Sequence, residues 1–413
     1  MIRRARTDAA GHAPGSWAVA DARYREGMAV TEVPVTPALR RARLAVSAAF
    51  FANGFAFANW AARIPAVKDH VGLSTGALGV ALLGIAIGAV VAMPLAGALL
   101  VRFDSRRMTR ATLALACVVL PLPALAGSLP ALMGALALLG IASGSLDVSM
   151  NAQGVMIERD YGRPVLAGLH GLWSLGTLGG ALVGGVAAGA GISPLAHLST
   201  VAAVLLAASM IATRHLLPGG GSRGQAAPSF ARPTRTLLLL GAIAFCGLLS
   251  EGAVYDWSTV YLRDDLGTAE GLAVSAYAAF TLTMTVGRLV GDRLRVRFGS
   301  RALLGSAALV AAAGLGAGLA IGQVVAAVIG FALLGAGLSC IAPITFGAAG
   351  KVSGLPSGPA IAAVSTMGYL GFIAGPPAIG GVGQLTSLPA ALLLVVALTA
   401  LVAVMARRLP PLD

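Results

Sequence analysis

Apolar runs of about 20 residues, broken by short polar or Gly/Pro-rich segments, recur along the chain from Leu44 onward. At a rise of 1.5 Å per residue, a helix of that length crosses the roughly 30 Å hydrocarbon core of a bilayer. The pattern predicts twelve membrane-spanning helices. Their predicted limits are 44–64, 75–101, 108–127, 130–157, 165–190, 194–214, 236–262, 271–293, 301–321, 324–346, 357–383 and 388–406.

Two polar segments divide this pattern. Residues 1–40 are Arg-rich and aperiodic, and they lack the apolar stretch of a secretory signal, so we expect a disordered cytoplasmic tail. Residues 215–235 are rich in Gly, Pro and Ser and form the predicted cytoplasmic linker. The helices between and after them make two predicted six-helix bundles, 41–214 and 236–408.

The two bundles share an internal repeat. VRFDSR begins at Val101 and VRFGSR begins at Val296, an offset of 195 residues. The same offset carries Leu138-Leu139-Gly140 onto Leu333-Leu334-Gly335. We therefore predict an all-α integral membrane protein whose twelve transmembrane helices form two pseudo-symmetric six-helix bundles. Parallel repeats of this kind are typical of secondary transporters that bind solute at the repeat interface.

Lys and Arg residues fall unequally on the two predicted sides of the membrane. With an even number of helices, both ends and the linker lie on one side, and Arg63, Lys68 and Arg263 lie on the other. The excess of Lys and Arg places the first side in the cytoplasm. Twenty cations fall there: Arg40, Arg41, Arg43, Arg102, Arg106, Arg107, Arg110, Arg159, Arg163, Arg214, Arg223, Arg232, Arg235, Arg293, Arg295, Arg297, Arg301, Lys351, Arg407 and Arg408.

Composition agrees with a membrane protein and excludes several other classes. The chain is 57% hydrophobic and 11% charged, against about a quarter charged in soluble domains. Its net charge of +13 comes from scattered basic residues, so no nucleic-acid partner is expected. The three cysteines form no metal-binding spacing. Walker, GxSxG and HExxH motifs are absent, so we expect no enzyme, metal or cofactor.

The strongest candidate site is an acid inside the fourth predicted helix. Asp147 and Asn151 lie one helical turn apart on one face. A carboxylate at membrane depth is costly, and such acids mostly mark a proton or solute pathway. A structural hydrogen-bond cluster between helices is the alternative interpretation. In the functional interpretation, protonation of Asp147 is linked to solute binding, and such linkage is reciprocal.

The seventh predicted helix adds two further acids. Glu251 and Tyr255 share a helical face, and Asp256 points away from it. We expect one of the two acids to contribute to proton coupling. The alternative for Asp256 is an ion pair with Arg63 or Arg263 at the outer gate.

Four residues on the first and fifth predicted helices are further candidates for solute contact: Asn59, Trp60, His170 and Trp173. A buried amide needs partners, which favours Asn59. His170 could relay protons, and Trp173 could stack on a sugar, but helix packing explains each of these residues equally well.

A second set of charged residues near the helix ends is predicted to form gates. Arg288 and Asp292 are four residues apart and are expected to pair within one helix. We place them with Glu158 and Arg106 at the cytoplasmic gate, and Arg63 at the outer one. Asp104 replaces a loop glycine and is expected to join the cytoplasmic set.

The loops GALLVRFDSRRMTR and GDRLRVRFGSR resemble the signature loops of the major facilitator superfamily. Within it, GSLDVSMN around Asp147 and FFANGFAFANWAARIPAVK resemble the fucose-permease-like group, and particularly an uncharacterised bacterial branch. That resemblance implies a role for Asp147 in proton coupling and substrate binding, a bacterial inner membrane location and a monomer. The acid that the group carries in its first helix falls on Ala61 here.

These observations predict a secondary transporter that works by alternating access and takes up a small polar solute, such as a sugar or sugar derivative, with protons. The alternative is a proton-driven efflux antiporter for a drug or metabolite. A cavity lined by Asn, Gln and acids would favour uptake, and one lined by Met, Phe and Leu would favour efflux. A membrane receptor that binds solute without moving it is a third interpretation.

Overall fold

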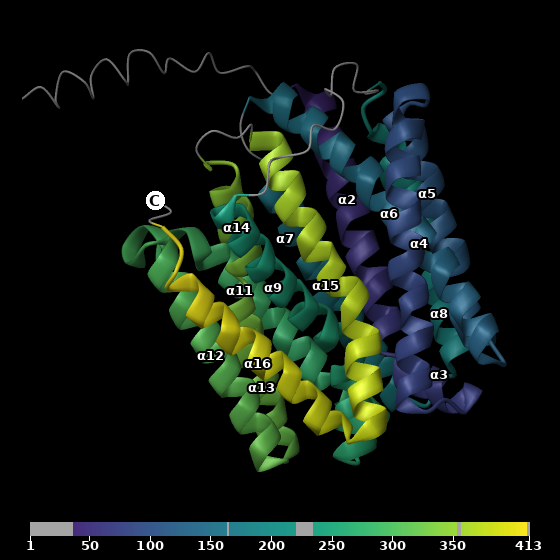
Figure 1. Ribbon diagram of the computed structural model, residues 1–413. Helices are drawn as coiled ribbons and strands as arrows, with labels where there is room; N and C mark the ends of the chain where they lie inside the picture. Colours follow the sequence, from purple (N-terminus) through teal and green to yellow (C-terminus); the bar gives the residue numbers. More distant parts are fainter. Residues whose placement is uncertain (1–35, 163–164, 220–233, 353–356, 411–413) are drawn as a thin grey trace, which may run out of the picture. The chain divides into compact units, whose positions relative to one another are not determined.

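The computed structural model describes residues 36–162, 165–219, 234–352 and 357–410 (Figure 1). Within these ranges the secondary structure is helical, with no strand. The first long helix begins at Pro37, a few residues before the predicted end of the tail. The rest of the tail and residues 220–233 of the linker lie outside the described residues.

The described residues of the first half form seven α-helices and two short 3-10 turns. They are α2 (Pro37–Ala61), α3 (Ile64–Val71), α4 (Thr75–Arg102), α5 (Ser105–Val119), η1 (Leu122–Leu125), α6 (Leu129–Tyr161), α7 (Leu166–Gly189), α8 (Pro194–Ala212) and η2 (Thr213–His215).

The second half repeats this pattern with more interruptions. Its elements are α9 (Arg235–Val260), the π-helical turn η3 (Tyr261–Asp265), α10 (Glu270–Ala273), α11 (Ser275–Phe298), α12 (Ser300–Ile321), α13 (Val324–Leu338), α14 (Ile341–Ala349), α15 (Ser357–Leu385) and α16 (Leu388–Ala406). Each of the twelve predicted apolar segments coincides with at least one of these helices.

Eleven helical segments among the described residues are long and apolar enough to cross a membrane. The remaining long helix, α15, has 29 residues, and Pro376 and Pro377 lie inside it. The paired prolines do not end α15. By contrast, the helix that contains Pro343 is interrupted just before it, at Ser339 and Cys340 between α13 and α14. Proline therefore lies next to a helix break in one place and inside a continuous helix in the other.

Hydroxyl side chains set many of the helix starts. Ser74, Ser128, Ser193, Thr234 and Ser387 each accept a hydrogen bond from the backbone N–H three residues later. Such caps satisfy donors that the first helical turn leaves free. Proline follows directly in the first turn of α6, α8 and α16, where its missing N–H does no harm.

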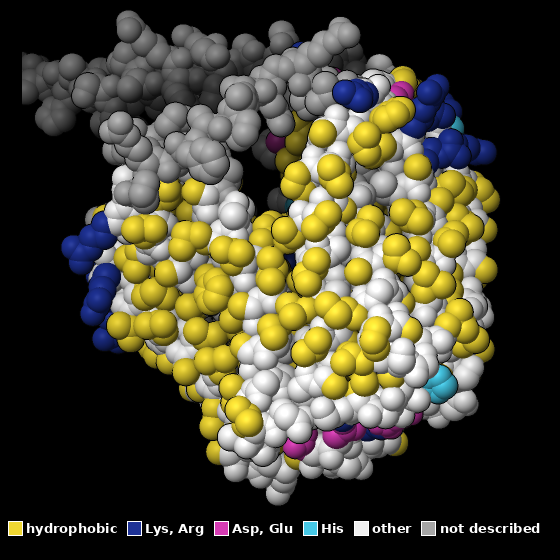
Figure 2. All heavy atoms as spheres, turned by 45° about the vertical axis from the view of Figure 1, so that its right-hand side comes forward, with side chains coloured by type: hydrophobic (Ala, Val, Ile, Leu, Met, Phe, Trp, Pro, Cys, Tyr) yellow, Lys and Arg dark blue, Asp and Glu magenta, His cyan; other side chains and the backbone are white. Residues whose placement is uncertain are grey.

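The helices share two ends. At the arginine-rich end α2 begins and α4, α6, α8, α11 and α16 finish, with Arg102, Arg214 and Arg407 among the residues there. At the other end, called here the ion-pair end, lie α3, η3 and α10. In Figure 2, dark blue side chains gather at the top of the right-hand helices and magenta ones along the lower face. The two ends therefore differ in charge.

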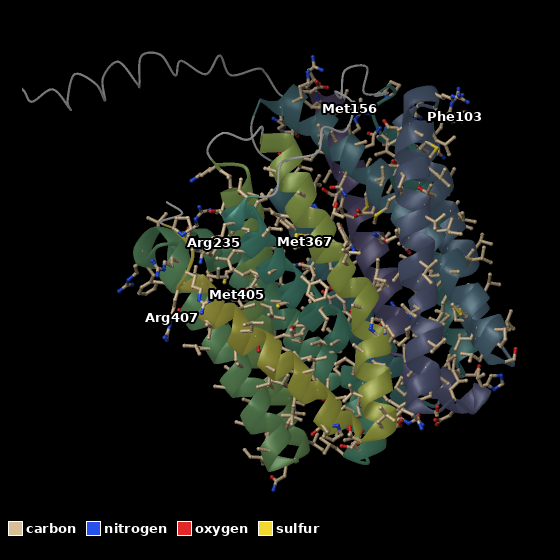
Figure 3. All side chains as sticks on the ribbon, viewed as in Figure 1. Phe103, Met156, Arg235, Met367, Met405 and Arg407 are labelled. Atoms are coloured by element: carbon tan, nitrogen blue, oxygen red, sulfur yellow. The ribbon has the colours of Figure 1, made fainter. Side chains whose placement is uncertain are left out.

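The described helices belong to one compact unit that starts at Pro37. Within it, α2 packs on α7 and α4 on α6 in the first half, and α9 on α15 and α12 on α13 in the second. The side chain of Met367 on α15, labelled in Figure 3, lies against Gly241 of α9.

The two halves meet where α15 packs on α4 and α11 on α7 (Figure 1). Near the ion-pair end, α4 and α15 touch through glycine. A Cβ atom at Gly79 would lie 2.6 Å from the carbonyl oxygen of Pro376, and one at Gly380 would lie 2.9 Å from the Cα of Gly79. Only glycine permits such close backbone contact. Figure 2 shows the surface hollowed between two groups of helices in the upper half of the view.

Candidate functional site

Glu251, in the middle of α9, is the centre of a polar cluster within the apolar helices. Its carboxylate oxygen Oε1 accepts a 2.5 Å hydrogen bond from the Tyr255 hydroxyl, one turn further along the helix. The same oxygen lies 3.2 Å from Nη2 of Arg288 on α11. A nearly buried carboxylate is thus stabilised by one phenol and one guanidinium.

Arg288 joins the two halves of the chain. While Nη2 binds Glu251 in the second half, Nη1 donates a 3.1 Å hydrogen bond to the hydroxyl of Ser174 on α7 in the first half. A guanidinium carries five N–H donors in a fixed plane, so donors remain for a polar solute. The expected partner of Arg288 was Asp292. The side chain of Asp292 lies outside the described residues, so this pairing stays a prediction; the described contacts of Arg288 are with α9 and α7, which pack against its face of α11.

Tyr255 is also the centre of an aromatic cluster, with partners from three other helices. Its ring lies 5.4 Å from Phe57 of α2, 6.5 Å from Trp173 of α7, and 5.6 Å and 5.9 Å from Tyr277 and Phe280 of α11, measured between ring centroids. The arrangements are all edge-to-face, a favoured geometry for aromatic pairs. Trp173 therefore lies beside the polar cluster, within aromatic contact of both halves.

Asp147 and Asn151 on α6 form the second acidic position. The Asn151 amide donates to the Asp147 backbone oxygen at 2.9 Å and to its carboxylate at 3.2 Å. This confirms that the two side chains share a helical face. The described residues show no cation in an ion pair with Asp147. Its carboxylate is thus hydrogen-bonded but not neutralised.

Two further side chains connect these positions. The phenol of Tyr369 on α15 lies close enough to interact electrostatically with both Asp147 and Glu251, which belong to different halves. His170 on α7 is exposed, packs edge-on against Phe50 at 5.2 Å and lies within the range of Arg288. Tyr369 therefore lies near an acid of each half, and His170 lies near Arg288.

Asp256 lies on the other side of α9. Its carboxylate makes no ion pair or hydrogen bond within the described part of the chain, and it lies close enough to interact with the Tyr277 phenol. The proposed outer-gate partners are occupied elsewhere: Arg63 lies beside Glu270, and Arg263 binds Asp69 and Asp264. The gate-contact alternative for Asp256 is therefore not what the structure contains.

Asn59 and Trp60 are fully buried in α2. The Asn59 amide donates to the Phe55 carbonyl at 2.8 Å, and its oxygen pairs with Nε2 of His197 on α8 at 2.8 Å. Asn59 thereby satisfies the requirement of a buried amide with protein partners. The structure places Asn59 in the packing between α2 and α8.

The ion-pair end holds three pairs across the halves. Lys68 of α3 binds Asp264, Asp69 binds Arg263, and Arg63 lies 3.6 Å from Glu270. Arg63 is almost fully buried and also donates to the Ile192 carbonyl. Burial lowers the pKa of the Arg63 guanidinium, and the Glu270 carboxylate partly offsets this. All three pairs join α3 or its start to η3 or α10.

At the arginine-rich end, the predicted gate residues stabilise helix starts. Asp104 caps α5 by accepting from the Arg106 N–H at 2.8 Å, and the Arg106 side chain donates to the Arg214 carbonyl at 2.8 Å. Glu158 accepts from the backbone N–H groups of Val165 and Leu166, at the start of α7. The side chain of Asp292 lies outside the described part of the structure.

Several residues of these clusters were not expected from the sequence. Tyr369 and Phe57 join the region around Glu251, and His197 supports Asn59. Lys68-Asp69 and Arg263-Asp264 carry opposite charges at the matching ends of the first helix of each half, a signal that could have predicted their pairing. No cluster of His, Cys, Asp or Glu that could hold a metal ion occurs among the described residues.

Comparisons with known proteins agree with this architecture. The family model of the Major Facilitator Superfamily matches residues 46–354. An uncharacterized MFS-type transporter of Yersinia pestis is 37% identical over 361 residues, which cover 87% of this chain and 93% of the relative.

Solved structures share the fold at low sequence identity. A bacterial homolog of the human lysosomal transporter Spinster, in an inward-facing and unoccupied conformation, gives a TM-score of 0.70 at 16% identity, covering 90% of this chain and 96% of the other. A single-residue variant of the fucose:proton symporter FucP of E. coli gives a TM-score of 0.60 at 17% identity, covering 89% and 98%.

Proposed function

Because the chain belongs to the Major Facilitator Superfamily, a family of transporters and not of enzymes, we propose that it moves a small polar solute, such as a sugar or sugar derivative, by proton-coupled alternating access. The observation that carries the proposal is Arg288, whose guanidinium binds Glu251 in one half and Ser174 in the other. A solute that takes these donors would change how the halves are joined.

The proton would be carried by an acid that has no fixed cation. Asp147 meets this condition, since its carboxylate has only the Asn151 amide as a side-chain partner among the described residues. Glu251 differs, because Arg288 already neutralises it. We assign Asp147 to proton exchange and the Glu251–Arg288 pair, with Tyr255 and Trp173, to solute binding. Asp256 is the alternative candidate for proton exchange.

The same proposal covers topology and location. Counting α15 as the twelfth membrane-spanning helix makes two six-helix halves, in line with the internal repeat. The excess of Lys and Arg at the arginine-rich end supports a cytoplasmic position for both termini. We propose that the protein is a multi-pass monomer of a bacterial inner membrane. In the conformation described here, its ion-pair end is closed.

One observation favours the efflux alternative. The cluster of Phe57, Trp173, Tyr255 and Phe280 beside Arg288 offers an aromatic surface to a flat amphipathic compound. Polar and aromatic side chains thus occur together. Identification of the transported solute would therefore distinguish uptake from efflux. Resemblance to the fucose-permease-like group supports a sugar as the first compound to try.

The test is solid-supported-membrane electrophysiology on proteoliposomes, with a panel of sugars, sugar acids and amphipathic cations. We expect a solute-evoked current in the wild type that Asp147→Asn abolishes. Asp160→Asn, the same change at an exposed position of α6, is the matched control and should retain the current. An unchanged current in Asp147→Asn would contradict the role of Asp147. A current evoked by amphipathic cations alone would favour efflux.

A further inference from the structure

A pocket of about 250 Å³ lies at the arginine-rich end, away from the Glu251 cluster. It is formed where the start of α2 meets the end of α8 and η2. Seven residues line it: Arg41, Leu44, Ala45, Ile211, Ala212, Arg214 and His215. The volume corresponds to about eight water molecules, enough for a small headgroup.

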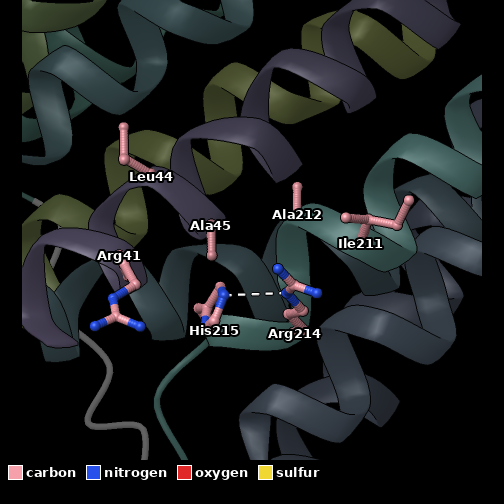
Figure 4. A pocket seen from close by; sticks show the side chains of 7 residues that line it. All are labelled: Arg41, Leu44, Ala45, Ile211, Ala212, Arg214 and His215. Carbon is pink, nitrogen blue, oxygen red and sulfur yellow. Dashed lines mark hydrogen bonds between the residues drawn. The ribbon is translucent and has the colours of Figure 1, made fainter.

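The polar part of the pocket is cationic. Its lining contains two arginines and one histidine and no acidic residue. Figure 4 shows His215 between Arg41 and Arg214. Nε of Arg214 donates to Nε2 of His215 at 3.1 Å, so the other imidazole nitrogen and the remaining guanidinium groups are available to a ligand. Charge complementarity therefore selects an anion with several oxygen acceptors.

The apolar part of the pocket faces away from the protein. Leu44 is 69% exposed and Ile211 is 62% exposed, although both belong to helices that are long and apolar enough to cross a membrane. Side chains at such positions meet lipid chains. A ligand that fills the pocket would thus place an anionic group among the cations and an apolar tail along Leu44 and Ile211.

The cationic groups are held on a fixed backbone. The Arg106 side chain donates to the Arg214 carbonyl at 2.8 Å, and the Thr213 hydroxyl donates to the Ser209 carbonyl at 2.6 Å. These bonds tie η2 to α5 and α8. Because the site is ordered before binding, less entropy is lost when a ligand binds.

We infer that this pocket binds the phosphate headgroup of an anionic phospholipid, with an acyl chain lying along Leu44 and Ile211. The inference stands apart from the proposed transport function, since none of its residues belongs to the Glu251 cluster. Basic pockets between helices at the cytoplasmic surface are suited to anionic headgroups. The headgroup would join α2 to α8 across the first half.

Native mass spectrometry of the full chain in detergent tests the inference. The protein is titrated with phosphatidylglycerol and with phosphatidylcholine of the same acyl chains. We expect preferential retention of phosphatidylglycerol. Each arginine is expected to contribute about fivefold in affinity, so the double variant Arg41→Gln/Arg214→Gln should bind about 25-fold more weakly. The Arg41→Lys/Arg214→Lys variant keeps the charges and should retain most of the binding.

The control variant is Arg102→Gln/Arg107→Gln, which removes two exposed arginines from the same end outside the pocket. It should bind as the wild type does. If the double glutamine variant does not fold, each single variant carries the test, with an expected loss of about fivefold. Equal binding of both lipids, an equal loss in the control, or displacement of the lipid by millimolar glycerol phosphate would overturn the inference; displacement would indicate a soluble phosphate ligand instead.

Discussion

Arg288 and Glu251 form an ion pair between α11 and α9, with 3.2 Å between Nη2 and Oε1. The side chains are 27% and 11% exposed, so both groups are largely removed from solvent. Removing one member of such a pair leaves the other charge uncompensated. The pair therefore stabilises the second half and also presents Arg288 to the first.

The Glu251–Arg288 pair is expected to behave as a unit in stability measurements. Glu251→Gln and Arg288→Gln should each lower the free energy of unfolding by about 1–3 kcal/mol, because a charged hydrogen-bond partner is lost. The double variant should lose less than the sum of the single losses. The unfolding free energies of the wild type, the two single variants and the double variant are measured in detergent by tryptophan fluorescence. Additive losses would contradict the pairing.

Gly79 is expected to be essential for the contact between α4 and α15. In Gly79→Ala, the added methyl would meet the Pro376 carbonyl, so the helices must separate. Overpacking of this kind costs about 1–3 kcal/mol and shifts the equilibrium away from the closed ion-pair end by about tenfold or more. Spin labels at positions 70 and 269, both exposed at this end, report the separation by double electron–electron resonance.

The matched control for this experiment is Gly97→Ala on the same helix. A Cβ atom at Gly97 meets no atom within 4 Å, so the distance distribution should remain that of the wild type. If Gly79→Ala also leaves the distribution unchanged, the glycine contact does not hold the two halves together.

The ion pairs at the same end are expected to differ in strength. Asp264 is 24% exposed and contacts both Lys68 and Arg263, whereas Asp69 is 55% exposed. Asp264→Asn should therefore open the ion-pair end more than Asp69→Asn does, by up to about fivefold in population, and high salt should reduce the difference. The same spin-label pair measures both variants. A larger effect of Asp69→Asn would refute this ranking.

Asn59 is expected to contribute to stability and not to solute binding. Asn59→Ala removes the partner of the buried His197 and should cost about 1–3 kcal/mol of unfolding free energy. The transport KM should stay unchanged. Asn53→Ala is the control, because Asn53 lies on the same helix and makes no hydrogen bond within the described residues. A raised KM in Asn59→Ala would restore Asn59 to the solute site.

The helices could be predicted because their signals are local. Long apolar runs indicated where they lie along the chain, and Ser74, Ser128 and Ser387 lie where new helices begin. The π-helical turn at Tyr261–Asp265 was not predicted, because it does not change the apolar pattern. The early start of α2 at Pro37 was missed because its first turns are rich in arginine.

The candidate site likewise contains contacts set by local helical geometry and contacts set by tertiary packing. Asp147 with Asn151 and Glu251 with Tyr255 are one turn apart, so helical geometry alone brings each pair together. The described partners of Arg288 on α9 and α7 are set by which helices pack against α11. Tyr369 and Ser174 likewise reach the region only through tertiary packing, which spacing along the chain does not specify.

The glycine contact between α4 and α15 has a mechanical consequence. Gly79 and Gly380 bring backbone against backbone, and one turn away Oε1 of Gln384 on α15 accepts a hydrogen bond from the Gly76 N–H of α4. Backbone surfaces of this kind can part and meet again with few side chains to rearrange. Separation of the two halves is then opposed mainly by the charged and aromatic contacts around Arg288, and less by the packing of α4 on α15.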